Sequence, residues 1–248
     1  MSQPFVSINT PIYDRKKFLP LMIKNLEISV YPKDKLEWVI LDSYGRDGDI
    51  AEPLFESDAQ VHALEKQLGL RIKYIYRKEA LSIGKKRNML AKLSTHDILI
   101  NMDSDDVYFH TYISYSVKTL IDNKLQCVGS PQMLFVYPND NYKVTMISCG
   151  KMRLAHEATM CLRKKHLKRM GGYCNSSQGE GTGIIDGCDE KMFKDTDIRF
   201  CMICVCGDHN TISKDIFNKD GHLLEKTNID SLPQLDILKS IFVQIRDR

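Results

Sequence analysis

The residues best suited to chemistry in this chain are three carboxylates that follow one apolar run. In the stretch DILINMDSDDVYF, the apolar residues 98–102 lead directly into Asp103, Asp105 and Asp106. Like charges held this close repel each other, so a bound cation is the expected compensation. Side chains two positions apart on an extended segment point the same way, so Asp103 and Asp105 can face one site. Mg²⁺ and Mn²⁺ prefer such oxygen ligands and share them with substrate phosphates. The alternative is a solvated acidic turn in which Asp106 caps the next helix.

Other polar residues also follow apolar runs. Thr10 and Pro11 come after the run 5–8, Asp42 ends the run 36–42, and His209 follows the last one. Ligands of open parallel sheets bind beyond the carboxyl ends of the strands, so these side chains are candidates for one shared site. His209 could be a neutral imidazole ligand of the same metal, and Asp42 could accept hydrogen bonds from a ribose or a base. The alternatives are a hydrogen-bonded loop histidine and a turn residue.

A predicted helix that begins near Ser82 carries Lys85, Lys86 and Arg87 in its first turns. Cations are disfavoured there by the helix dipole, and such a conflict is expected at functional sites. An anion such as a diphosphate would resolve it. The alternative is a solvated basic face.

The elements that must position these residues alternate between strand and helix over the first hundred residues. Apolar runs predict strands at 5–8, 36–42, 71–76 and 97–102, and helical spacing predicts helices at 14–30, 58–69 and 82–93. Asp14 is a possible N-cap of the first helix, and Gly69 is a good C-terminal stop for the second. The alternation predicts an α/β fold with a mostly parallel central sheet flanked by helices.

The remainder of the chain predicts shorter strands and an amphipathic C-terminal helix. Leu235, Leu238, Phe242 and Ile245 form one helical stripe. We therefore expect a catalytic domain over residues 1–215 and a helical extension over residues 216–248 that packs on it. The same stripe could instead pair with a second copy in a homo-oligomer.

Composition excludes several classes. The chain has 248 residues, 43% apolar and 27% charged, with a net charge of +3, which argues against a general nucleic-acid binder. No apolar run approaches the roughly 18–20 residues of a membrane span, and the N-terminus does not resemble a signal peptide. We expect a cytoplasmic protein whose eight cysteines are reduced. The sequence CMICVC lacks a second ligand cluster, so it predicts a buried strand in preference to a metal site.

The segments FVSINTPIYDR, LEWVILDSYG, SIGKKRN and DILINMDSDD, in this order, resemble family-2-type glycosyltransferases of the GT-A fold, which carry a DxD motif. The resemblance implies a metal-dependent enzyme of the hexosyltransferase type. Such an enzyme would transfer a sugar from a nucleoside-diphosphate-sugar, with UDP favoured and GDP possible, to a hydroxyl of a glycan, protein or small molecule. Inversion at the sugar is a family expectation.

The resemblance also implies roles for individual residues. Thr10, Pro11 and Asp42 should border the nucleoside, Arg87 should lie near the same pocket beside Gly84 or Lys85, and Ser104 should line the donor site. The cofactor, Mn²⁺ or Mg²⁺, should bind Asp105 directly, with Asp103 nearer the ribose or a bridging water and His209 as a further ligand.

The acceptor base is less well defined. The family places an acidic pair after a Gly-Gly-aromatic turn, and here GGYCNSSQGEGTGIIDGCDEKMF offers Glu180, Asp186 and Asp189. Glu180 is preferred to Asp189, and Asp186 could act as an N-cap.

Two other functions stay open: a nucleotidyltransferase, and an inactive module that binds a sugar nucleotide or glycan. The P-loop and dinucleotide-binding glycine motifs are absent from the sequence, which argues against those two classes of enzyme.

Overall fold

The fold is given by a computed structural model, which describes residues 3–44, 51–150, 155–186, 189–210, 213–219 and 231–243. Within these residues, seven strands form one sheet in the order β10-β6-β9-β4-β1-β2-β3. Their bounds are β1 Val6–Ile12, β2 Leu36–Tyr44, β3 Arg71–Ala80, β4 Ile98–Asn101, β6 Cys127–Gly129, β9 Cys161–Arg163 and β10 Phe193–Asp195.

The centre of this sheet is parallel. Strand β1 pairs in parallel with β2 and with β4, β2 pairs in parallel with β3, and only β9 runs antiparallel to its neighbours β4 and β6 among these seven strands. Parallel strands need covering on both faces, and the continuous apolar runs of β1, β2 and β4 are buried accordingly. The predicted α/β fold with a mostly parallel sheet is therefore confirmed.

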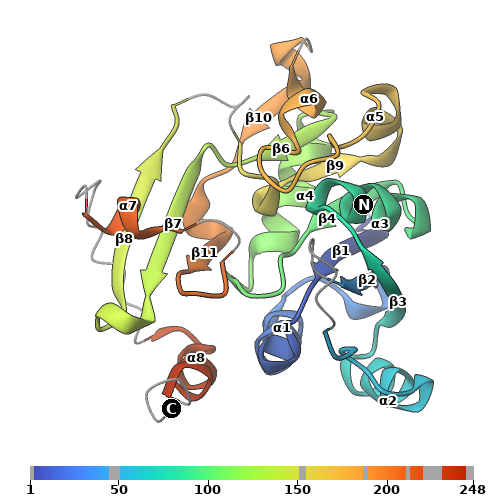
Figure 1. Ribbon diagram of the computed structural model, residues 1–248. Coiled ribbons are helices and arrows are strands. Elements are labelled where there is room, and N and C mark those ends of the chain that lie inside the picture. The colour runs from blue at the N-terminus through green and yellow to red at the C-terminus, as the bar shows by residue number, and fades with distance from the viewer. Residues whose placement is uncertain are drawn as a thin grey trace.

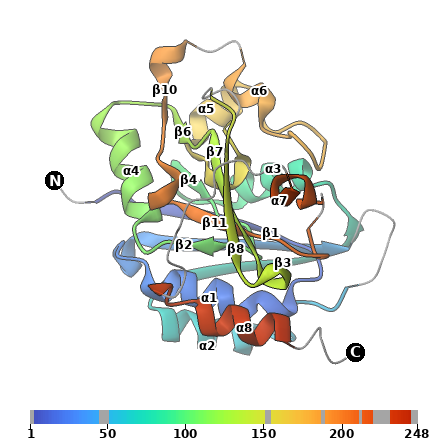
Figure 2. The ribbon, with the colours of Figure 1, turned by 90° about the vertical axis from the view of Figure 1, so that its left-hand side faces the viewer.

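Helices cover both faces (Figures 1 and 2). Apolar side chains of α1 (Leu19–Ile28), α2 (Asp58–Leu68) and α4 (Tyr112–Asp122) join one core cluster with the sheet. Helices α3 (Ile83–Leu93), α5 (Lys164–Arg169) and α6 (Thr182–Ile185) lie on the other face. Short 3₁₀ turns occupy Lys16–Phe18, Lys33–Lys35, Pro138–Asp140, Glu157–Thr159, Glu190–Met192 and Ile198–Phe200.

A second, four-stranded sheet lies beside the first, in the order β5-β11-β7-β8 (Figure 1). It consists of β5 (Val107–Tyr108), β7 (Gln132–Tyr137), β8 (Lys143–Ser148) and β11 (Met202–Val205). Strand β11 contains most of CMICVC and is buried, as the sequence predicted. Strand β5 directly follows the DSDD segment and pairs with β11. The acidic segment therefore lies between β4 of the first sheet and β5 of the second sheet.

The C-terminal helix α8 (Leu235–Val243) lies beside α1 (Figure 2). Its side chains Leu235, Leu238, Ile241 and Phe242 are buried, so the predicted apolar stripe packs on the domain, and Ile245 lies outside the described residues. The boundary at residue 215 stays a prediction, and the short helix α7 (Asp215–Lys219) begins there.

Two local predictions need correction. Strand β1 does not stop before Thr10 and Pro11, because both residues keep their register with Ile40 and Leu41 of β2. Asp14 is not a helix cap: it has a φ of +48°, and the chain forms a 3₁₀ turn before α1 begins at Leu19. The predicted stop at Gly69 is confirmed, with a left-handed φ of +66°.

Candidate active site

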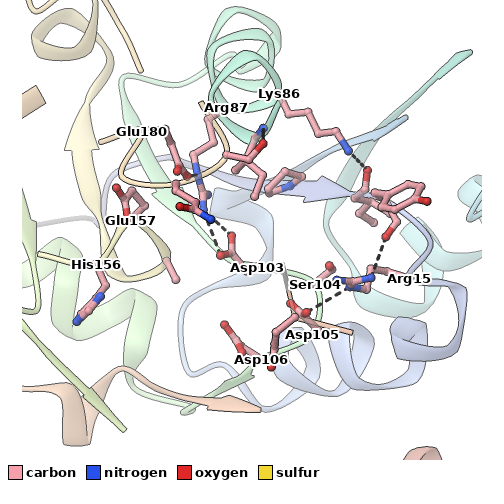
Figure 3. Close-up of a pocket in the computed structure, with 18 of the residues that line it drawn as sticks. Arg15, Lys86, Arg87, Asp103, Ser104, Asp105, Asp106, His156, Glu157 and Glu180 are labelled. Carbon is pink, nitrogen blue, oxygen red and sulfur yellow. Dashed lines mark hydrogen bonds and ion pairs between the residues drawn. The ribbon is translucent and has the colours of Figure 1, made fainter. Parts of the chain in front are cut away.

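A cavity of about 640 Å³ opens at the carboxyl ends of β1 and β4, as expected for an open parallel sheet (Figure 3). Strand ends, the first turns of α3 and the segment 177–180 contribute to its lining. The residues that were predicted from sequence and line it are Pro11, Arg87, Asp103, Ser104, Asp105 and Glu180. The sheet thus brings together most of the acidic and basic residues that the strand-end argument selected.

Arg87, on α3, links two of these carboxylates (Figure 3). Its Nη2 lies 2.9 Å from Asp103 Oδ1, and its Nε lies 2.9 Å from Glu180 Oε1. The Arg87 side chain is only 3% exposed, and the two carboxylates raise the pKa of its guanidinium above an already high value. Arg87 therefore stays charged and fixes the first aspartate of the DSDD segment against the loop that carries Glu180.

The second aspartate, Asp105, has different partners. Its Oδ2 accepts a hydrogen bond from Nε of Arg15 at 3.2 Å and lies 3.6 Å from Nε2 of His209. Arg15 also donates to the backbone oxygens of Tyr13 and His209, so it connects the segment after β1 with the segment after β11. Figure 3 shows the contact between Arg15 and Asp105 on the side of the pocket opposite Glu180.

His209 fits the role of a metal ligand. Its imidazole is almost fully buried against Phe18 and Phe242, and burial lowers its pKa to about 4, so the ring is neutral at pH 7. Nε2 is buried and has no hydrogen-bond partner among the described residues. A neutral nitrogen aimed at a carboxylate is suited to share a divalent cation with it.

The described residues do not bring three His, Cys, Asp or Glu side chains together as metal ligands. Asp103, which was expected to take part, is turned towards Arg87. Among the described residues, Asp105 and His209 are a pair of side chains that could hold a cation, and the remaining positions would then fall to substrate phosphates and water, as is usual for Mg²⁺.

The basic residues of α3 differ from the expectation. Lys85 is exposed and does not line the cavity, whereas Lys86 is 4% exposed, lines it and donates from Nζ to the backbone oxygen of Ile12. Burial lowers the pKa of Lys86 to about 8. Helical spacing explains why Lys86 reaches the cavity and Lys85 does not. Positions 83, 86, 87 and 90 share the helix face towards the sheet, and position 85 lies on another face.

The first turn of α3 also does not offer free N–H groups to an anion. Ile83 N donates to Ser177 Oγ, Gly84 N donates to the Ser176 backbone oxygen, and Lys85 N donates to Ser82 Oγ. The predicted diphosphate site at this helix terminus is thus replaced by intramolecular contacts. Gly84 is needed for this packing, because a Cβ there would lie 1.8 Å from the Cys174 backbone oxygen.

We expect Gly84→Ala to lower the free energy of unfolding by about 3 kcal/mol, measured by urea denaturation, because the segment 174–177 must move off α3 to admit the methyl group. The matched control is Gly183→Ala on α6, where the nearest atom to a new Cβ is Cys174 Sγ at 3.8 Å. Equal losses in the two variants would contradict this packing argument.

Four more predicted residues are not among those that line the cavity, namely Thr10, Asp42, Asp189 and His209, the last of which lies beside Asp105. Thr10 accepts a hydrogen bond from Trp38 Nε1 inside the sheet, and Asp42 is 1% exposed. Asp42 Oδ2 accepts from Leu54 N and from the Tyr74 hydroxyl, while Oδ1 has no partner among the described residues, and burial raises the pKa of this carboxyl. Asp189 is exposed and accepts from Lys191 N.

Sequence reasoning missed several lining residues, among them Arg15, His156, Glu157 and Lys214, whereas Lys86 and Asp106 were noted but given no role in the site. His156 and Glu157 precede β9 and lie on the Glu180 side of the cavity (Figure 3). No strand-end pattern marked them, because they belong to a loop before a strand.

No described helix combines the length and the apolar character that a bilayer crossing requires.

Residues 7–176 match the family described as glycosyl transferase family 2. No curated protein matches the chain in sequence. Among solved structures, it is similar to mannosyltransferase PcManGT from Pyrobaculum calidifontis in complex with GDP-Man and Mn²⁺, with a TM-score of 0.63 and 16% identity over 85% of this chain and 59% of that one.

The chain is also similar to S. aureus TarS 1-349 in complex with UDP, with a TM-score of 0.60 and 15% identity over 82% of this chain and 61% of that one. For the same protein in complex with UDP-GlcNAc, the TM-score is 0.60 at 14% identity, over 98% and 67% of the two chains. The chain thus spans about 60% of the length of the first structures it matches. These likenesses confirm the predicted GT-A fold. Because the family match extends over more than half of the sequence, the chain belongs to glycosyl transferase family 2.

Proposed function

We propose that this chain transfers a sugar from a nucleoside-diphosphate-sugar to an acceptor hydroxyl with the help of Mn²⁺ or Mg²⁺. The observation that supports this most is the division of charge in the cavity. Asp105 lines the cavity and forms a donor pair for a cation with His209, which lies beside it, while Arg87 and Lys86 of α3 form a buried basic side. A bound diphosphate can contact a cation with some of its oxygens and basic side chains with others, and this cavity offers both.

The cavity also suits the size of the donor. Its volume of about 640 Å³ lies within the range of about 300–1,000 Å³ that is typical for small-molecule sites. Two of the similar structures are complexes with GDP-Man and with UDP, which supports a nucleoside diphosphate here without choosing the base. We favour a UDP-sugar and retain a GDP-sugar as the alternative, with Pro11, Ser104 and Asp103 close to the donor.

A cation bound by Asp105 and His209 would neutralise the charge that develops on the leaving diphosphate. The chain's own residues prepare this site. Arg87 holds Asp103 in place, and the Phe18 and Phe242 rings hold the His209 imidazole. Attack by an acceptor hydroxyl opposite the leaving group would invert the sugar.

Arg15 occupies the carboxylate oxygen that the cation would use, so the two should compete. We expect Arg15→Gln to tighten Mn²⁺ binding about tenfold in the absence of nucleotide, which corresponds to about 1.4 kcal/mol, measured by calorimetry. The control is Lys16→Gln, because Lys16 carries the same charge but pairs with Glu52 and Glu56. Unchanged or weaker Mn²⁺ affinity in the Arg15 variant would contradict the competition.

The acceptor class, glycan, protein or small molecule, stays open, as do a homo-oligomer through α8 and a cytoplasmic location.

The experiment that tests the proposal is a screen of UDP-sugars and GDP-sugars with Mn²⁺ against a panel of glycosides. We expect release of UDP or GDP together with a glycosylated product. Pyrophosphate release from a nucleoside triphosphate would instead identify a nucleotidyltransferase. Donor binding with no transfer and no hydrolysis would identify an inactive binding module.

A further inference from the structure

We propose that Glu157, rather than Glu180 or Asp189, is the carboxylate that accepts the proton of the acceptor hydroxyl. This assignment rests on the proposed function and concerns the same cavity. Glu157 lies in the 3₁₀ turn before β9, lines the cavity and is half-buried. Figure 3 shows it on the same side of the pocket as Glu180, across from the contact between Arg15 and Asp105.

The first argument is that the other lining carboxylates are engaged elsewhere. Glu180 Oε1 is bound by Arg87, and its side chain is 6% exposed, so proton uptake there would break a buried ion pair. Asp103 shares the same guanidinium, and Asp105 is bound by Arg15.

Asp106 and Asp189 are unsuitable for other reasons. Asp106 is buried and accepts from Val205 N, which ties it to the pairing of β5 and β11. Asp189 is exposed, does not line the cavity, and precedes the 3₁₀ turn Glu190–Met192, where it accepts a hydrogen bond from Lys191 N. A base must reach the proton that it removes, so position excludes Asp189 before its acidity is considered.

The second argument is that the fold holds Glu157 in one position. Its Oε1 accepts a hydrogen bond from Gly181 N at 2.9 Å, and its backbone oxygen accepts one from Asn101 Nδ2 at 2.7 Å. Asn101 ends β4, two residues before Asp103, so the turn is fixed to the strand that carries the acidic segment. A functional carboxylate that is held on rigid elements in this way is preorganised for proton transfer.

The third argument is the glycine beside it. A Cβ at position 181 would lie 2.7 Å from Glu157 Cγ, so a side chain there would displace the Glu157 carboxylate. The φ of Gly181 is −87°, which any residue can adopt, so the backbone does not require glycine. Space for Glu157 is therefore the reason that the structure gives for Gly181.

The second oxygen of Glu157, Oε2, receives no hydrogen bond from the described residues and is available to the acceptor. In the transfer step, the hydroxyl proton passes to Oε2 while the hydroxyl oxygen bonds to the anomeric carbon. The bond from that carbon to the diphosphate oxygen breaks, and its electron pair leaves on the diphosphate. Glu157 then returns the proton to solvent.

The test is Glu157→Gln, which keeps an oxygen for Gly181 N and removes the base. The probes are UDP-GlcNAc and GDP-mannose with Mn²⁺, with water as the acceptor, and the readouts are UDP or GDP release against pH and calorimetric binding of UDP and GDP. We expect release to fall at least about 100-fold with unchanged nucleotide affinity, and the decline of the rate at acid pH to disappear. Glu27→Gln on α1, an exposed residue outside the cavity, is the matched control and should behave as wild type.

Release within about threefold of wild type in Glu157→Gln would overturn the assignment, and a large loss in Glu180→Gln alone would transfer the role to Glu180. Wild-type protein that binds UDP or GDP but hydrolyses neither donor would also overturn it, while donor binding would stand. Failure to bind either nucleotide would instead remove the proposed function itself.

Discussion

Arg87→Ala is expected to lower the free energy of unfolding by about 3–5 kcal/mol and to abolish nucleotide binding. The variant leaves the buried Glu180 and the partly exposed Asp103 without the guanidinium that both of them contact at 2.9 Å. Uncompensated buried charge is among the largest single-residue penalties in folded proteins, and the loss of a partner costs more than the pair itself contributes.

Two further variants separate charge from geometry. Arg87→Lys keeps the charge but cannot contact both carboxylates at once, so we expect a smaller loss of stability and weak nucleotide binding. Arg71→Ala removes an exposed arginine from β3 and should change neither property. Chemical denaturation and nucleotide titration of the three variants provide the measurement. An Arg87→Ala variant within about 1 kcal/mol of wild type would show that Arg87 does not hold the two carboxylates.

Asp105→Asn is expected to remove the stimulation of nucleotide binding by Mn²⁺ and to lower sugar transfer at least about 100-fold. The amide keeps the shape of the side chain and an oxygen for Arg15, so the fold should survive. The substitution removes the negative charge of Asp105. His209 Nε2, which lies 3.6 Å from Asp105 Oδ2, then has no charged partner with which to hold a cation. The measurements are nucleotide affinity with and without Mn²⁺ and the rate of transfer from the donor identified by the screen.

The control for this variant is Asp122→Asn, which makes the same chemical change on α4, where Asp122 is exposed and pairs with Lys118. We expect it to match wild type in both measurements. Full Mn²⁺-stimulated transfer by Asp105→Asn would mean that the DSDD carboxylates are structural and that the repulsion between them has another compensation.

The parts of the site that were predicted from sequence are those that depend on short-range order. Apolar runs located the ends of β1 and β4, and strand ends in a parallel sheet meet at one edge, so Asp103, Asp105 and Pro11 could be selected together. Arg87 followed from its place in the first turns of a predicted helix. The fold class was predictable for the same reason, since strand–helix alternation is visible along the chain.

The errors concern the direction of side chains. Thr10 and Asp42 lie on strands that are buried on both faces, so a polar side chain there can pack against the sheet and not face the cavity. The alternation of residues along the strand does not show which of these two directions a side chain takes. Lys86 could have been preferred to Lys85 from the helical period, because only the face shared with Ile83 and Leu90 meets the sheet.

The remaining residues of the site could not be predicted from sequence, because their partners are distant along the chain. Arg15 meets Asp105 over 90 positions, and Arg87 meets Glu180 over 93. The hydrogen bond between Gly181 N and Glu157 joins residues that β9 and α5 separate in the sequence. No local pattern marks such contacts, since they are products of the topology.

The most direct test of the central claim, that the cavity binds a nucleoside diphosphate together with a divalent cation, is calorimetric titration of the wild-type chain with UDP and with GDP, each with and without Mn²⁺. We predict binding of one nucleotide that strengthens at least tenfold with Mn²⁺, which would also identify the base. Absence of binding by both nucleotides, or affinity that is indifferent to Mn²⁺, would contradict the account.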